Sequence, residues 1–269
     1  MVIFIPTPIG NILDITYRAV EVLQKLDLIF CEDTRVTKNL LKLLQERLDI
    51  SFPDYELVSF NEHNAKKRLK EYGKKIKSLN VGFMSDAGMP AISDPGSELV
   101  RFCQAEKIEY DFLPGASVAP LVYAASGFES GKFYFYGFLP SKGQKREKEL
   151  LELLNLPMDI VLYEAPHRII KLLEEIVLID EQRELFVAKE LTKKFQRYFF
   201  GSAKEILQQL KTISIKGEWA LVIKAAPKDR SSDIKEILSL DLAPKKKAKL
   251  LAKATNRSVK EWYDELTKK

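Results

Sequence analysis

Apolar and polar residues follow two alternating periods along the first half of the chain, and these periods predict its secondary structure. Short apolar runs occur at 2–5, 28–31 and 81–84, and mainly apolar segments interrupted by polar residues occur at 57–60 and 108–113. Most of these runs are followed by a segment with apolar residues every three or four positions, such as Leu40, Leu41 and Leu44. Buried strands that alternate with amphipathic helices are typical of a parallel sheet with helices on its faces. The first half is therefore predicted to be an α/β domain.

The second half has a different rhythm, with several strands that follow one another more closely. The expected strands are an aromatic run at 133–136, apolar runs at 160–163 and 185–188, an edge strand at 198–200 and a last strand at 219–224 that closes the sheet. This pattern favours a mixed sheet. From Pro227 onward the chain becomes polar and then helical. We expect a parallel-sheet α/β domain at 1–116, a mixed-sheet α/β domain at 117–226 and a small helical tail at 227–269.

The stretch Ser85–Gly96 reads S-D-A-G-M-P-A-I-S-D-P-G and lies between a predicted strand and a predicted helix. It is longer than the roughly 2 to 6 residues that such a connection needs. Its glycines allow close approach of the backbone to a ligand, and Asp86 and Asp94 place two carboxylates where parallel sheets usually bind ligands. The alternative for any one of these residues is an ordinary Asp/Pro/Gly turn, with Asp94 as a helix cap.

Other strand ends carry small or charged residues in the same way. Glu32-Asp33-Thr34-Arg35 follows the second run, His63 lies in the loop after the third, and Pro114–Ser117 follows the fifth. Carboxylates beside an arginine at a strand end favour a site, although a structural ion pair is the alternative. Pro-Gly-Ala-Ser before a helix offers N–H groups and a hydroxyl to a carboxylate or a ribose.

Composition adds a mild positive charge and excludes some classes. The 269 residues carry a net charge of +5. Basic residues concentrate at Lys142–Arg146, Lys189–Arg197 and Lys245–Lys249, where they can follow phosphates or simply solvate helix faces. Cys31 and Cys103 suggest neither a disulfide framework nor a Cys/His metal site. No signal peptide or membrane span is recognisable, so we expect a soluble, cytoplasmic protein without a membrane partner.

Nine motifs in order along the chain resemble a known family, the ribosomal RNA small subunit methyltransferases I. Besides Ser85–Gly96, they are T-P-I-G-N at 7–11, C-E-D-T-R at 31–35, H-N at 63–64, P-G-A-S at 114–117, G-F-L-P at 137–140, Y-E-A-P-H-R at 163–168, K-E-L-T-K at 189–193 and G-E at 217–218. That family resembles the tetrapyrrole methylases. The resemblance implies two α/β domains with S-adenosylmethionine in the cleft between them. It also implies 2′-O-methylation of a cytidine ribose in 16S rRNA of the small ribosomal subunit, and a homodimer.

The resemblance also assigns cofactor-binding positions across both domains. They are Ile9, Asp86, Met89, Ile92, Ser117, Val118, Tyr163, Leu191, Thr192, Trp219 and Ala220. Three residues depart from the family pattern: Met89 replaces a threonine, Ala116 replaces a proline, and Gln196 stands where an acidic residue is common. The first two changes are expected to alter local packing, and the third argues against a catalytic role for position 196.

A ribose hydroxyl is a weak nucleophile, so its methylation benefits from a general base or from a cation that stabilises the developing alkoxide. The candidate bases are Glu32, Asp33, His63, Glu164, His167 and Glu190, and the candidate cations are Arg35, Arg168, Lys189 and Lys193. We favour Asp33 and Glu190 because Arg35 and Lys193 lie within a few residues of them. The same cations are alternatively ligands for RNA phosphates.

Two other functions fit parts of the pattern. A small-molecule methylase of the tetrapyrrole type shares the cofactor loops but has no need of the basic clusters. A non-catalytic RNA-binding module needs the basic clusters but no cofactor loops. Binding of S-adenosylmethionine in equilibrium dialysis distinguishes the module from the two enzymes.

Overall fold

The computed structural model describes residues 1–226, 237–255 and 257–267, and the chain forms two compact units. The large unit comprises residues 1–154 and 158–224 and contains both sheets. The small unit comprises residues 155–157 and the described part of 225–269. The residues of the predicted tail between 227 and 236 lie outside the described part.

The first sheet has five strands in the order β3-β2-β4-β1-β5, and every neighbouring pair is parallel. The strands are β1 (Val2–Ile5), β2 (Leu28–Cys31), β3 (Glu56–Ser59), β4 (Val81–Met84) and β5 (Tyr110–Phe112). The predicted parallel sheet is therefore confirmed, and three of its strands begin and end at the predicted residues.

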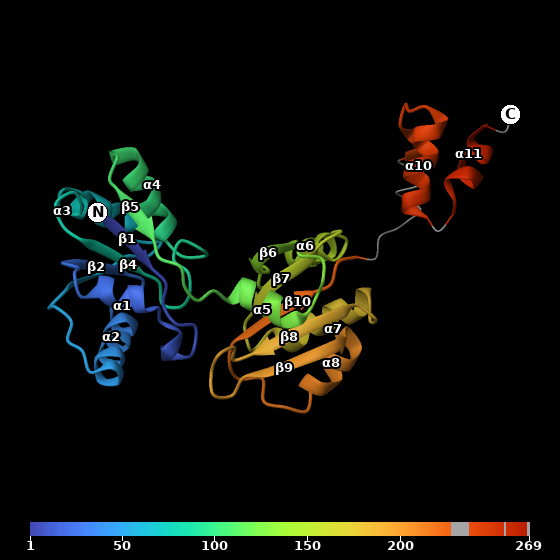
Figure 1. The fold of residues 1–269 in the computed structure, drawn as a ribbon. Helices are drawn as coiled ribbons and strands as arrows, with labels where there is room; N and C mark the ends of the chain where they lie inside the picture. The colour runs from blue at the N-terminus through green and yellow to red at the C-terminus, as the bar shows by residue number, and fades with distance from the viewer. Residues whose placement is uncertain (227–236, 256, 268–269) are drawn as a thin grey trace. The chain divides into compact units, whose positions relative to one another are not determined.

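Both faces of this sheet are buried, which explains its continuous apolar strands. The helices are η1 (Ile12–Asp14), α1 (Tyr17–Leu23), α2 (Thr34–Leu48), α3 (Ala65–Ile76) and α4 (Gly96–Glu106), seen around the blue and green strands in Figure 1. Val2 and Phe4 pack with residues of α3 and α4. Ile3 and Ile5 point to the other face and pack with residues of α1 and α2. Because all neighbouring strands are parallel, the five strand ends that carry the motifs emerge on one edge of the sheet.

The second sheet is mixed, as predicted. Its order is β6-β7-β10-β8-β9, with β6 and β7 parallel and the other neighbours antiparallel. The strands are β6 (Phe133–Phe138), β7 (Asp159–Glu164), β8 (Glu184–Lys189), β9 (Arg197–Ser202) and β10 (Trp219–Ile223). The edge strand at β9 is confirmed. The last strand does not close the sheet at an edge but lies in its centre, because β10 is apolar and buried on both faces.

Helices cover this sheet as well. They are α5 (Val118–Ser126), α6 (Gln144–Leu154), α7 (Ile169–Ile179) and α8 (Ala203–Leu210). Val122 and Tyr123 of α5 share a core with Val161, Ala188 and Val222 of the strands. Ile9 from the first loop belongs to the same core, so the two sheets are joined by packed side chains.

In the described part of the small unit two helices pack on each other, in agreement with the expected helical tail. They are α10 (Pro244–Ala254) and α11 (Val259–Thr267). Ala248 and Leu251 of α10 pack on Trp262 of α11. The indole N–H of Trp262 donates to the Thr255 hydroxyl at 2.8 Å, and the Arg257 guanidinium lies 4.1 Å from the indole ring centre. In the described part of the chain, no helix is long and apolar enough to cross a bilayer.

Candidate functional site

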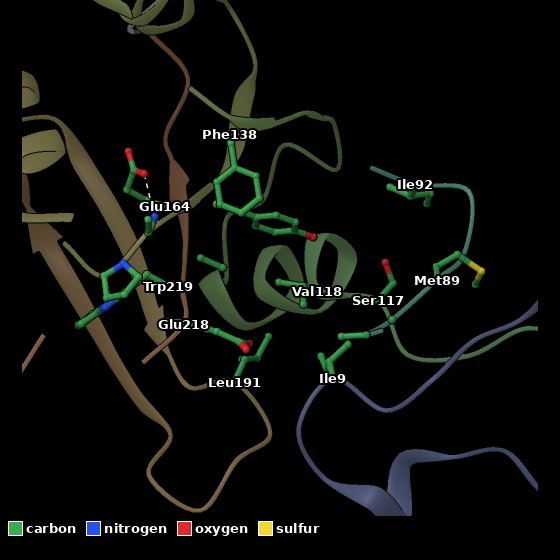
Figure 2. Close-up of a pocket in the computed structure, with 17 residues that line it drawn as sticks. Ile9, Met89, Ile92, Ser117, Val118, Phe138, Glu164, Leu191, Glu218 and Trp219 are labelled. Carbon is green, nitrogen blue, oxygen red and sulfur yellow. Dashed lines mark hydrogen bonds between the residues drawn. The ribbon is translucent and has the colours of Figure 1, made fainter. Parts of the chain in front are cut away.

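A cavity of about 370 Å³ lies where loops of the first sheet meet α5 and the second sheet. Figure 2 shows side chains from these elements pointing into it. It is lined by Ile9, Ala87, Gly88, Met89, Ile92, Ser117, Val118, Phe138, Tyr163, Glu164, Ala165, Pro166, Ala188, Leu191, Glu218, Trp219 and Ala220. Most of these side chains are apolar, so the cavity favours a ligand with apolar or aromatic parts.

The loop between β4 and α4 forms one wall of the cavity. Thr7 and Gly88 exchange backbone hydrogen bonds of 3.0 and 3.1 Å, and this bridge holds the loop beside the first loop. Gly88 has φ of +82°, which favours glycine, and a Cβ there would also crowd the Ile9 side chain at 3.2 Å. Asp94 accepts hydrogen bonds from the N–H groups of Ala91 and Gly96 and so holds the turn before α4, whose N-cap residue is Pro95.

Besides the carboxylates of Glu164 and Glu218, two hydroxyl-bearing side chains line the mostly apolar cavity. Ser117 precedes α5 and makes no side-chain capping bond to that helix. Tyr163 is half-buried, and burial raises the pKa of its hydroxyl to about 12. The tyrosine therefore stays protonated at neutral pH and can donate a hydrogen bond. Together they provide the few placed polar groups that orient a ligand in an apolar pocket.

The connection after β8 forms the opposite wall through Leu191. Its neighbours Glu190 and Thr192 have φ of 53° and 64°, a conformation that costs energy in residues other than glycine. The Thr192 hydroxyl accepts from the Asn11 N–H at 3.1 Å. A Cβ on Gly10 would lie 2.4 Å from Lys193 and 2.9 Å from the Leu191 carbonyl oxygen, so this contact between the two α/β parts requires glycine.

Glu190 is held by two donors. Its Oε1 accepts from the Glu218 N–H at 2.8 Å and from Lys193 Nζ at 3.3 Å. Burial alone raises the pKa of Glu190, but the Glu218 N–H and the Lys193 ammonium outweigh it and lower the pKa. Lys193 also pairs with the Glu218 carboxylate at 2.9 Å. Glu190 and Lys193 thus form an ion pair beside the cavity residue Leu191.

Asp33 and Arg35 are also brought together, at the start of α2. Asp33 is the N-cap of this helix, and its carboxylate accepts from the Arg35 N–H at 2.8 Å and from the guanidinium at 2.6 Å. The hydrogen bond from the Arg35 side chain is the main reason why the pKa of Asp33 falls to about 2. Asp33 is therefore ionised at neutral pH and is a weaker base than an ordinary aspartate.

Glu32 and Asp86 lie beside Asp33, and their carboxyl groups behave differently. Asp86 Oδ1 accepts from the Asp33 N–H at 3.1 Å, and Glu32 accepts from the Asp86 N–H at 3.4 Å. Burial is the largest cause that raises the pKa of each, and neighbouring carboxylates add to it. Neither carboxylate forms an ion pair among the residues that the structure describes. Both are consequently better suited than Asp33 to exchange a proton.

Arg146 does not belong to a phosphate-binding cluster, which corrects one expectation from the sequence. Its side chain is only 1% exposed. It pairs with Glu164 at 3.1 Å and with Glu175 at 2.8 Å. Arg168 binds the other oxygen of Glu164 at 2.7 Å. The arginine therefore anchors the cavity residue Glu164 from behind, and no surface is left for RNA.

The other predicted site residues are distributed as follows. Every predicted cofactor position lines the cavity except Asp86 and Thr192, which lie next to lining residues. His63 and His167 are exposed and lie outside the lining. Lys189 donates to the Ser214 carbonyl oxygen and lies 5.4 Å from the Trp219 ring. The roles of all these residues remain predictions.

Some lining residues were not among the predicted cofactor positions. They are Ala87, Gly88, Phe138, Glu164, Ala165, Pro166, Ala188 and Glu218. All but Ala188 belong to the motifs quoted above, so these residues could have been predicted from the motifs in which they lie. Ala188 immediately precedes K-E-L-T-K and is small because α5 packs on it.

Comparison with known proteins gives the same result over most of the chain. Residues 1–207 match the family model of the Tetrapyrrole (Corrin/Porphyrin) Methylases. Ribosomal RNA small subunit methyltransferase I of Helicobacter pylori strain J99 is 40% identical over 98% of this chain and 96% of its own length. The protein of that name from Campylobacter fetus is 41% identical over 99% of both chains. The one from Thermotoga maritima is 43% identical over 82% of this chain and 96% of its own.

Solved structures with low sequence identity share the fold. Diphthine synthase superposes with a TM-score of 0.64 at 14% identity and covers 83% of this chain and 89% of its own. Cobalt precorrin-4 methyltransferase superposes with a TM-score of 0.58 at 16% identity and covers 83% and 94%. The fold, the family model and the full-length relatives agree, and the chain therefore belongs to the tetrapyrrole methylases, among the ribosomal RNA small subunit methyltransferases I.

Proposed function

We propose that the protein transfers a methyl group from S-adenosylmethionine to the ribose 2′-oxygen of a cytidine in 16S rRNA. The observation that carries the proposal is the near-complete coverage of the relatives at 40% identity. Those relatives are named as ribosomal RNA small subunit methyltransferases, which supports the small-subunit RNA as the acceptor. The nine motifs support the ribose of a cytidine as the methylated group.

The cavity fits a nucleoside-sized cofactor with an amino-acid tail. Its volume of about 370 Å³ lies within the range of small-molecule sites. Apolar walls at Ile9, Val118 and Leu191 suit an adenine ring, and the Ser117 and Tyr163 hydroxyls suit polar ends. When bound, S-adenosylmethionine supplies a methyl group on a positively charged sulfur.

The contribution of the chain to the reaction is mainly positioning. Holding an acceptor and a donor in line can supply about 7–11 kcal/mol of the barrier. We assign Asp33 the role of orienting the ribose hydroxyl through its ionised carboxylate, with Arg35 holding the carboxylate in place. Glu190 and Lys193 hold the strained turn that presents Leu191 to the cavity. Glu32, whose pKa burial raises, is the neighbouring carboxylate suited to take the proton.

The test is incubation with S-[methyl-³H]adenosylmethionine and either naked 16S rRNA or 30S subunits, followed by mapping of the methylated nucleotide. We expect label on a cytidine ribose. Label on a base, or only on a tetrapyrrole added in parallel, would overturn the assignment. Equilibrium dialysis with the same cofactor separates an inactive preparation from a protein that binds no cofactor at all.

Matched methionine variants connect the activity to the cavity. Met89→Trp places a larger side chain on the cavity wall, and it should weaken both cofactor binding and methyl transfer. Met158→Trp is the control, since Met158 is 36% exposed and lies at the other end of β7 from the cavity residue Glu164. Equal activity of the two variants would place the cofactor elsewhere.

A further inference from the structure

Phe195 is an exposed aromatic residue at the tip of the connection between β8 and β9. Its side chain is 70% exposed, which is unusual for a phenylalanine. The connection starts at the cavity, because Leu191 lines it. Phe195 itself does not line the cavity. An aromatic ring is thus presented to solvent four residues along the chain from a residue that lines the proposed active site.

The backbone beneath Phe195 is well fixed. The N–H of Lys193 donates to the Glu190 carbonyl oxygen at 3.0 Å, and the N–H of Gln196 donates to the Lys193 carbonyl oxygen at 3.1 Å. The Gln196 side chain accepts from the Thr192 N–H at 2.5 Å. Gln196, which departs from the family pattern, therefore has a local role in this turn. The ring is exposed because the turn holds it outward.

Two cations flank Phe195 along the chain. Lys194 Nζ is 5.7 Å from the ring centre of Phe195, and Arg197 begins β9 with its side chain exposed. Among the residues that the structure describes, neither of them pairs with a carboxylate, whereas Lys193 pairs with two. An exposed ring between unpaired cations matches the stacking platforms of proteins that bind single-stranded nucleic acid.

We propose that Phe195 stacks on an unpaired RNA base next to the methylated nucleotide, and that Lys194 and Arg197 bind the adjoining phosphates. The inference rests on the proposed function, because it takes the RNA to be the substrate. A neighbouring base is assigned rather than the target itself, since Phe195 lies outside the cavity lining. Charge complementarity favours RNA, because successive phosphates would neutralise the two cations while the exposed ring stacks on a base.

The experiment compares Phe195→Ala, Phe195→Trp and Phe195→Leu in the full chain. The probe is a fluorescein-labelled single-stranded RNA of about ten nucleotides that contains cytidine, which is within the usual site size. Phe195→Ala should raise Kd by about 5- to 150-fold, the range for one stacked base. Phe195→Trp should restore binding, because it keeps a stacking surface. Phe195→Leu should bind as weakly as alanine, because it keeps only apolar volume.

Salt dependence separates the ring from the cations. Phe195→Ala should leave the slope of log affinity against log salt unchanged, because the ring binds no phosphate. The double variant Lys194→Ala/Arg197→Ala should flatten the slope by about 0.7 for each lost phosphate contact. Leu178→Ala is the matched control: Leu178 is 87% exposed and lies on α7, which precedes the other end of β8. It should change neither Kd nor the slope.

Steady-state kinetics on the RNA that the wild type methylates complete the test. Phe195→Ala should raise KM for RNA and leave kcat near the wild-type value, because a neighbouring base is bound equally in ground and transition states. Wild-type-like KM and Kd in Phe195→Ala would overturn the inference. RNA binding by Phe195→Leu with the wild-type Kd would also overturn it. So would a change in oligomeric state of Phe195→Ala in solution, because that change would indicate that Phe195 contacts a second copy of the chain. If the wild type methylates no RNA, the proposed function fails instead.

Discussion

The carboxylates on the two sides of the cavity differ in how their charge is balanced. On the side of the first sheet, Glu32 and Asp86 are partly buried, without a cation within ion-pair distance among the described residues. On the side of the second sheet, Glu164 is bound by Arg146 and Arg168. Burial raises the pKa values of the two carboxyl groups on the first side, whereas two guanidinium groups pair with the carboxylate on the second. The first side is thus able to exchange protons, and the second side serves as a fixed frame.

The largest expected effect is a loss of stability when Arg146, which pairs with Glu164, is replaced. Arg146→Met leaves Glu164 and Glu175 without one of their partners inside the protein. Breaking one side of a buried ion pair typically lowers the free energy of unfolding by about 3–5 kcal/mol. Urea denaturation followed by circular dichroism measures this loss. Lys145→Met, one residue away and exposed, should stay within about 0.5 kcal/mol of wild type. Equal stability of both variants would mean that the pairs do not anchor the frame.

Asp33→Asn tests the carboxylates beside the first sheet, among which Asp33 is ionised at neutral pH. Loss of a carboxylate that orients the ribose should lower single-turnover methylation by about 100-fold, at the low end for positioned acid–base groups. Cofactor affinity should change little, because Asp33 does not line the cavity. If Asp33 only shapes the loop with Arg35, then Arg35→Ala should give the same loss and both variants should melt earlier. Near-wild-type turnover in folded Asp33→Asn would move the search to Glu190 and Glu32.

Asp86→Ala should weaken the binding of S-adenosylmethionine to an intermediate extent and leave the affinity for RNA unchanged. Asp86 accepts the Asp33 N–H and precedes the lining residues Ala87 and Gly88. Loss of one such hydrogen bond costs about 1–2 kcal/mol, or roughly 10-fold in affinity. Isothermal titration with S-adenosylmethionine measures it, with RNA affinity as the internal control. A parallel loss of RNA affinity would show that the two surfaces are not separate.

The smallest expected effect is a difference between Asp33 and Glu32 in how their contributions to stability depend on pH. The lowered pKa of Asp33 contributes stability that is present above about pH 4 and is lost as pH falls towards about 2. The raised pKa of Glu32 has the opposite sign, so its contribution is present below pH 4.5 and is lost as pH rises through its folded pKa. Melting temperatures of Asp33→Asn and Glu32→Gln relative to wild type should therefore drift in opposite directions with pH. Drift in the same direction would contradict the proposed charge balance.

Most of the first sheet could be predicted because its three central strands are buried on both faces. Val2–Ile5, Leu28–Cys31 and Val81–Met84 are uninterrupted apolar runs, and polar loops mark their ends. The central place of β10 could not be read in the same way. Its apolar run indicates burial, but the order of strands depends on pairing across the sheet, which leaves no local signal.

The residues that line the candidate site could be predicted from motifs, but the burial and ion pairing of its charged residues could not. Tyr163 and Leu191 were named from motifs and line the cavity, whereas Arg146 was grouped with surface lysines. The helical spacing of Arg146, Leu150 and Leu153 places the arginine on the buried face, and this signal was present in the sequence. Which carboxylates lose water and which gain a cation is set by distant segments that meet only in three dimensions.

The irregularity in β6 has a consequence for how its motif can vary. Phe135 pairs with Val161 and Phe138 pairs with Tyr163, so one extra residue is accommodated between them, with Gly137 at φ of +82°. The extra residue keeps Phe138 on the face of Phe135, where its ring meets Tyr163 at 5.6 Å and closes the cavity. Chain length is therefore as constrained here as residue identity. Shortening β6 by one residue would leave every motif letter of G-F-L-P intact and still turn the phenylalanine away from the cavity.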